Sequence, residues 1–106
     1  MDETQYQRIS EDCINSIADT LEAADAEGSL DVEYQAGVLT VDLSSGKQLL
    51  VSKHTASRQI WLSSPISGGL HFSHDGKAWC LADGRTLAQV LSQELKQLAG
   101  IDVTFA

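Results

Sequence analysis

The side chains with the clearest chemical potential in this sequence are carboxylates, and most of them lie near one end of the chain. Ten of the 15 acidic residues fall within residues 1–33, where Arg8 is the only base, so this segment has a formal charge of −9. The other five acids and six bases give +1, and the whole chain has a formal charge of −8. Carboxylate oxygens favour hard cations, such as Fe²⁺, Fe³⁺, Mn²⁺ and Ca²⁺, over zinc or Cu⁺. This charge excludes nucleic acid as a partner and suits a cation or a basic protein surface.

The remaining reactive side chains do not form a catalytic pattern. Cys13 and Cys80 are far apart, lack a CxxC spacing and are predicted to be buried or half-buried free thiols. None of His54, His71 and His74 has a second His or Cys at the spacing of a metal site. No serine lies in a G-x-S-x-G motif. The sequence therefore predicts a protein that binds rather than an enzyme.

An amphipathic helix over residues 2–24 is the first element that must position the carboxylates. Its apolar side chains recur at steps of three and four residues. They are Tyr6, Ile9, Cys13, Ile17, Leu21 and Ala24. At 100° per residue, a set of acidic side chains falls on the opposite face, where Arg8 can pair with Glu11 or Asp12. That set is Glu11, Asp12, Asp19 and Glu22.

A second concentration of carboxylates spans the end of this helix, the following loop and the first strand. Its members lie within a window of twelve residues, which could bring several of them together. They are Glu22, Asp25, Glu27, Asp31 and Glu33. Such exposed ligands imply weak, exchangeable binding, because each would supply few oxygens and the cation would retain several waters.

Short apolar stretches follow, most of them alternating with polar residues, which predict strands, and glycines mark most of the turns between them. The predicted strands cover residues 30–35, 39–43, 47–53, 59–63, 70–72 and 78–81. The facing of the third strand is ambiguous, because Leu49, Leu50 and Val51 are consecutive. Gly68-Gly69 is expected to make the turn before the fifth strand. Thr86 is expected to begin a second helix, with Gln89 as its capping-box partner, and Gly100 is expected to end it.

Helix, antiparallel meander and helix predict an α+β fold over residues 1–106, a single-domain two-layer α/β sandwich. Two helices with one apolar stripe each can cover only one face of an antiparallel sheet of about six strands. In the fourth strand, Ile60 and Leu62 would face the core, and Trp61 is expected to be exposed on the open face. Trp79 is expected in the core. The chain has no run of ~20 apolar residues and no signal-peptide pattern at its start, which predicts a cytoplasmic protein without a membrane partner.

The order of these motifs resembles the frataxin family, in particular its bacterial CyaY-type members. The resemblance covers residues 3 to about 100 and rests on an acidic first helix, a D-x-E strand, G-x-L-T-V, and a final leucine-rich helix. Its most specific part is Q-I-W-L-S-S-P-x-S-G-G-x-H-F, which begins at Gln59. The chain departs from the family pattern at Ser52, His54 and Ala56, where an asparagine and a Gln-x-Pro are usual.

The resemblance implies an iron-binding accessory protein of iron–sulfur cluster assembly that contacts a cysteine desulfurase and a scaffold protein. It implies weak, exchangeable Fe²⁺ or Fe³⁺ binding on an acidic ridge, where other hard cations could substitute. The ridge residues are Glu3, Glu11, Asp12, Asp19, Glu22, Asp25, Glu27, Asp31 and Glu33. Gln59 and Trp61 on the sheet, together with Asp19 and Glu22, are expected to contact the partner.

Two alternatives remain open at this point. The first is a ferroxidase that oxidises Fe²⁺ and stores iron in oligomers, which would need closely grouped ligands. The second is a metal-independent docking module, whose carboxylates serve only to bind a basic protein. The protein is expected to be a monomer that metal can drive into oligomers.

Overall fold

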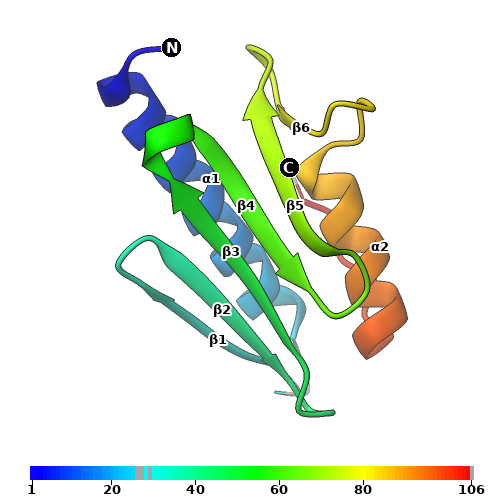
Figure 1. Cartoon of the computed structure of the whole chain (residues 1–106). Coiled ribbons are helices and arrows are strands. Elements are labelled where there is room, and N and C mark those ends of the chain that lie inside the picture. The colour runs from blue at the N-terminus through cyan, green and yellow to red at the C-terminus, as the bar shows by residue number, and fades with distance from the viewer. Residues whose placement is uncertain (26–27, 29, 106) are drawn as a thin grey trace.

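A computed structural model describes residues 1–25, 28 and 30–105 of the 106-residue chain. Within these residues, two helices and a short 3₁₀ turn accompany a six-stranded sheet (Figure 1). In chain order the elements are α1 (Glu3–Ala24), β1 (Leu30–Gln35), β2 (Val38–Leu43), β3 (Gln48–His54), η1 (Thr55–Ser57), β4 (Gln59–Ser64), β5 (Gly68–His74), β6 (Trp79–Cys80) and α2 (Leu87–Ala99). Neither of these helices is long and apolar enough to cross a membrane.

The sheet is an antiparallel meander in the order β1-β2-β3-β4-β5-β6, so that each strand pairs with its neighbour in sequence. Both helices lie on the same side of it (Figure 1). The core fills the space between the two layers, where Tyr6, Leu49, Ile60, Phe72 and Leu95 are fully buried. Neither α1 nor α2 lies on the other face of the sheet, which is called the open face below. The predicted α+β sandwich is therefore confirmed.

Helix α1 begins and ends near its predicted limits, but the prediction of its buried face was partly wrong. Asp2 caps its N-terminus, where the carboxylate accepts a hydrogen bond from Gln5 N at 2.7 Å. Its buried side chains are Tyr6, Ser10, Ile14, Ile17, Ala18 and Leu21. The predicted stripe omitted Ile14 and included Ile9 and Cys13, which are only half-buried. The sheet covers the column of Ile14 and Leu21, and the neighbouring column faces a cavity beside α2.

Helix α2 confirms the predicted limits in detail. Thr86 Oγ1 accepts from Gln89 N at 3.1 Å, and Gln89 Oε1 accepts from Thr86 N at 3.0 Å, which completes a capping box. Gly100 ends the helix in the left-handed conformation with φ 67°. Cys13 and Cys80 are both free and partly buried, as expected, and Trp79 lies in the core.

The register of the sheet fixes which side chains share the open face. One row across it is Gln35–Val38–Ser52–Trp61–His71, and the next is Glu33–Thr40–Leu50–Ser63–Gly69. Leu50 therefore faces outward between Leu49 and Val51, which are buried. The expectation that Gly68-Gly69 forms a turn was wrong in part, because β5 begins at Gly68 and Gly69 pairs with Ser63.

Candidate metal-binding ridge and docking face

The acidic side chains of α1 are exposed, as the sequence predicts, but they extend along the whole helix. Glu3, Glu11, Asp12, Asp19 and Glu22 all face solvent. Glu3 and Glu22 are 19 positions apart, which corresponds to roughly 28 Å along the axis at ~1.5 Å per residue. The helical part of the ridge is therefore an extended surface rather than one coordination sphere.

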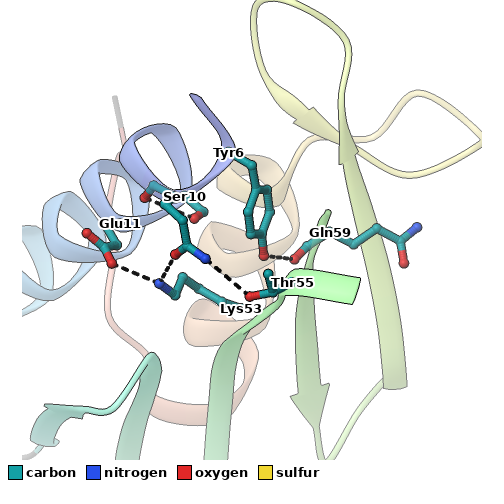
Figure 2. Close-up of polar contacts among 7 residues, drawn as sticks. Tyr6, Ser10, Glu11, Lys53, Thr55 and Gln59 are labelled. Atoms are coloured by element: carbon teal, nitrogen blue, oxygen red, sulfur yellow. Dashed lines mark hydrogen bonds and ion pairs between the residues drawn. The ribbon is translucent and has the colours of Figure 1, made fainter. Parts of the chain in front are cut away.

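Glu11 is engaged by a lysine from the sheet. Lys53 Nζ lies 2.8 Å from Glu11 Oε1 and 2.5 Å from Gln7 Oε1, and Gln7 Nε2 donates to Thr55 Oγ1 at 3.5 Å (Figure 2). The sequence suggested Arg8 as the partner of Glu11 or Asp12, and the structure corrects this for Glu11. Lys53 follows Leu49 and Val51 on the helix-facing side of β3, so its stem passes under α1 and its ammonium group emerges beside Glu11.

Four of the helical carboxylates form two lines along α1, which face different directions around the helix axis. At 100° per residue, Glu11 and Glu22 lie within ~20° of one direction, and Asp12 and Asp19 lie within ~20° of another. Asp12 lines the cavity between α1 and the start of α2, whereas Glu11 contacts β3. Glu22 and Asp19 remain neighbours across one helical turn, at i and i+3.

The carboxylates after the helix divide between its end and the open face. Asp25 Oδ2 accepts a hydrogen bond from Leu30 N at 2.9 Å, which joins the end of α1 to the start of β1. Glu27 lies outside the described residues. Asp31 and Glu33 are exposed on the open face of β1, and Asp31 stands directly opposite Asp42 of β2. No three His, Cys, Asp or Glu side chains among the described residues lie close enough to hold one metal ion.

Trp61 lies on the open face, as predicted, but two histidines cover its ring. The His54 ring stacks on the indole with 3.7 Å between centroids and 8° between planes. His71 stacks with a centroid distance of 4.2 Å and an interplanar angle of 14°. The three rings come from β3, β4 and β5, and the indole between them is half-buried. The expectation of an exposed Trp61 was therefore only partly correct, because a neighbour covers each of its faces.

Gln59 fixes the orientation of this stack. Its side-chain Oε1 accepts from Trp61 Nε1 at 3.1 Å and from Ser57 Oγ at 3.0 Å. Ser57 Oγ also lies 2.6 Å from His54 Nδ1. Gln59 thus holds the indole in place through hydrogen bonds to its neighbours, which is a positioning role. His54 was not among the predicted partner contacts, although its place two residues after Ser52 puts it on the open face.

A tyrosine connects the ridge-bearing helix to this strand. Tyr6 is fully buried and its hydroxyl donates to Gln59 O at 2.8 Å (Figure 2). Burial raises the pKa of Tyr6, so the hydroxyl remains a donor at neutral pH. Its ring meets Trp79 edge-on, with 6.0 Å between centroids. Helix α1 is therefore anchored directly beneath the residue that orients Trp61.

The turn between β5 and β6 contains a carboxylate with a strongly shifted pKa. Asp75 accepts hydrogen bonds from the backbone N–H groups of Ala78 and Lys77, both at 2.8 Å. These bonds favour the charged form and lower the pKa of Asp75 from 3.8 to about 2. Asp75 is thereby committed to the turn, and it is not part of the ridge.

Comparison with known proteins agrees with this architecture. The model of the frataxin-like domain matches residues 1–101. The frataxin of Psychromonas ingrahamii superposes with a TM-score of 0.90 at 18% identity, covering 100% of this chain and 99% of that one. Trimeric frataxin from the yeast Saccharomyces cerevisiae, complexed with ferrous ion, superposes with a TM-score of 0.77 at 25% identity, covering 94% of this chain and 88% of that one. Another yeast frataxin structure has a TM-score of 0.76 at 27% identity, with coverages of 92% and 82%. With two helices over a six-stranded antiparallel sheet and a family match along nearly its whole length, the chain belongs to the frataxin family.

Proposed function

We propose that this chain is an iron-binding accessory protein of iron–sulfur cluster assembly that acts on a cysteine desulfurase–scaffold complex in the cytoplasm. The observation that carries the proposal is the family match over residues 1–101. The ferrous complex of the yeast relative supports iron as the metal. In this proposal the protein binds iron and its partner and catalyses no reaction itself.

The arrangement of the ridge favours weak, exchangeable iron binding. Its described carboxylates are exposed or half-exposed and spread over α1 and β1, and no three potential ligands of the described residues converge. A cation held by one or two such carboxylates retains most of its water and exchanges readily. Weak binding suits the transfer or sensing of iron better than its storage, and other hard cations would compete for the same oxygens.

An anaerobic Fe²⁺ titration followed by amide NMR tests the metal part of the proposal. We expect the responding amides to lie within residues 19–33, and we expect the paired change Asp19→Asn with Glu22→Gln to weaken the response severalfold. Asp83→Asn is the matched control, because Asp83 is an exposed acid that pairs with Arg85 and is neither a ridge residue nor within residues 19–33. A response that avoids residues 19–33 would show that the ridge assignment is wrong.

Binding to a purified desulfurase–scaffold complex tests the partner contacts. Asp19, Glu22, Gln59 and Trp61 are the proposed contacts, and removal of a large aromatic residue at an interface typically costs ~2 kcal/mol or more, about thirtyfold in Kd. In calorimetric titrations we therefore expect Trp61→Ala to raise the Kd about thirtyfold. Gln93→Ala on α2 should leave the Kd unchanged. Equal affinities for the two variants would refute the sheet contact.

The two alternatives differ in measurable ways. A ferroxidase would accelerate oxygen-dependent oxidation of Fe²⁺ in stopped-flow measurements, whereas the proposed function leaves the oxidation rate unchanged. A metal-independent docking module would bind the desulfurase complex but show no rise in melting temperature with Fe²⁺, because only a ligand of the native state stabilises it. We expect a monomer without metal, and sedimentation with added iron would detect metal-driven oligomers.

A further inference from the structure

The open face contains an apolar hollow beside Trp61. Its volume is about 270 Å³, and Val38, Leu50, Trp61, Ser63, Gly69 and His71 are among its lining residues. The hollow exists because the side chains in the row Leu50–Ser63–Gly69 become smaller from β3 through β4 to β5. A Cβ atom at Gly69 would meet no atom within 4 Å, and its φ is not in the left-handed region. Glycine is therefore not required there by the backbone.

The stack determines how a partner can use this part of the face. His54 and His71 cover both faces of the Trp61 indole, so a partner group cannot stack on the indole without displacing one of them. The indole can still contribute its edge to the hollow. Val38 is 37% exposed and Leu50 is half-buried, which leaves apolar surface uncovered beside this edge. A hollow of this size accommodates one large aliphatic side chain.

The strands next to the hollow are acidic. Glu33 lies in the same row as Leu50, two strands away, at roughly 10 Å for an inter-strand spacing of ~4.8 Å. Asp31 and Asp42 form the facing pair in the adjoining row. Among the ion pairs of the described residues, none involves these three carboxylates, and Asp42 accepts only from Gln48 Nε2 at 2.7 Å. Charge complementarity therefore favours basic residues beside the group that enters the hollow.

We propose that the hollow binds a single large aliphatic side chain from a basic segment of a protein partner, with flanking lysines or arginines paired to Asp31, Glu33 and Asp42. This inference rests on the proposed function, in which the open face contacts a partner protein. The inference adds that an aliphatic side chain of the partner enters the hollow beside Trp61, and that Gly69 keeps the hollow open.

Two synthetic pentapeptides test this chemistry on the ¹⁵N-labelled full chain. One has a leucine between two lysines on either side, and the other has a serine in place of the leucine. We expect the leucine peptide to shift the signals of Leu50, Gly69 and the Trp61 indole N–H, and the serine peptide to bind about tenfold more weakly, since a partly buried leucine contributes ~1.4 kcal/mol. Equal affinities, or shifts confined to α1, would overturn the proposal.

Variants of the hollow provide the second arm. Gly69→Val fills it without backbone strain, and Val38→Ser removes part of its apolar wall, so each should reduce the affinity of the leucine peptide to that of the serine peptide. Gln93→Val is the control, because it adds the same aliphatic branch on α2, outside the sheet, and should change nothing. Unchanged melting temperatures verify that the variants fold. Retention of leucine-peptide affinity by both variants would overturn the proposal.

The same variants separate this inference from the proposed function. If the desulfurase–scaffold complex binds the wild type and Gly69→Val equally well, while Trp61→Ala loses binding, the hollow has no role and the proposed function stands. If the complex does not bind the wild type, the partner part of the proposed function fails. The peptide titrations then still report whether the hollow selects an aliphatic side chain in a basic segment.

Discussion

The ion pair between Lys53 and Glu11 gives the sharpest test of how α1 is fixed to the sheet. The two charged atoms lie 2.8 Å apart, with 15% of the lysine side chain and 51% of the glutamate side chain exposed. At that separation, Coulomb's law gives about 1.5 kcal/mol for an effective dielectric constant of ~80 and about 6 kcal/mol for ~20. Desolvation of the lysine and screening at the half-exposed glutamate offset most of this, which leaves an expected coupling of about 1 kcal/mol.

A double-mutant cycle measures this coupling directly. The free energy of unfolding in urea would be determined for the wild type, Lys53→Met, Glu11→Gln and the double variant. Methionine keeps an aliphatic stem over Gly37, where Lys53 Cε lies 3.2 Å from the position of an ideal Cβ. The cycle therefore isolates the charge, provided that the hydrogen bond to Gln7 contributes equally in both backgrounds.

An exposed pair in the same protein serves as the reference. Lys96 and Asp102 are also 2.8 Å apart, but 59% and 82% of their side chains are exposed. We expect their coupling to be about 0.3 kcal/mol and to vanish in 1 M NaCl, where the Debye length is about 3 Å. A coupling for Lys53 and Glu11 that is no larger than this reference, or that vanishes equally in salt, would refute the reasoning from burial.

Three further predictions follow from groups described above. The ¹³C resonance of the Asp75 carboxyl should titrate with a midpoint of about pH 2. Because folding lowers this pKa from 3.8, the contribution of Asp75 to the free energy of unfolding is present above pH 3.8 and is lost as the pH falls toward 2, and Asp75→Asn should flatten the pH dependence of stability between these values. Burial raises the pKa of Cys13 to about 11, so iodoacetamide should alkylate it at pH 8 about 100-fold more slowly than a thiol of pKa 9, and an ordinary rate would show that the site opens readily. His71→Ala should uncover one face of Trp61 and increase its quenching by acrylamide, and an unchanged quenching constant would contradict the stacked arrangement.

Much of the fold could be predicted because its local signals agree. The two-residue alternation in β1, β2 and β4 gives the correct buried and open faces. Glycines near the turns and the capping box of Thr86 mark where elements begin and end. In β3 three apolar residues in succession left the facing ambiguous, and only the pairing of Val51 with Leu62 resolves it.

The buried side of α1 was harder to predict because two apolar columns lie next to each other. Ile9 and Cys13 form one column, and Ile14 and Leu21 form the other. A periodicity count ranks both as apolar, and only the position of the sheet decides that Ile14 is fully buried while Cys13 is not. Tertiary packing, rather than helical propensity, therefore determines which column is fully buried.

The contacts of the candidate site depend on partners that are distant in sequence. Lys53 reaches Glu11 across 42 positions, and no local pattern places β3 beneath the first half of α1. The sequence similarly places Trp61 on the open face but does not show that His54 and His71 stack on it. Composition and spacing could predict which residue types meet solvent, whereas their pairing required the register of the sheet.

The position of β1 at one edge of the sheet has a consequence for aggregation. An unpaired edge strand can add a strand from another copy of the protein. An antiparallel pair of β1 strands centred on Val32 would place Asp31 of each copy opposite Glu33 of the other, with Cβ atoms about 5 Å apart. Repulsion between these like charges opposes such a pair, so the edge resists fibre-like growth as long as its carboxylates stay ionised and free of cations.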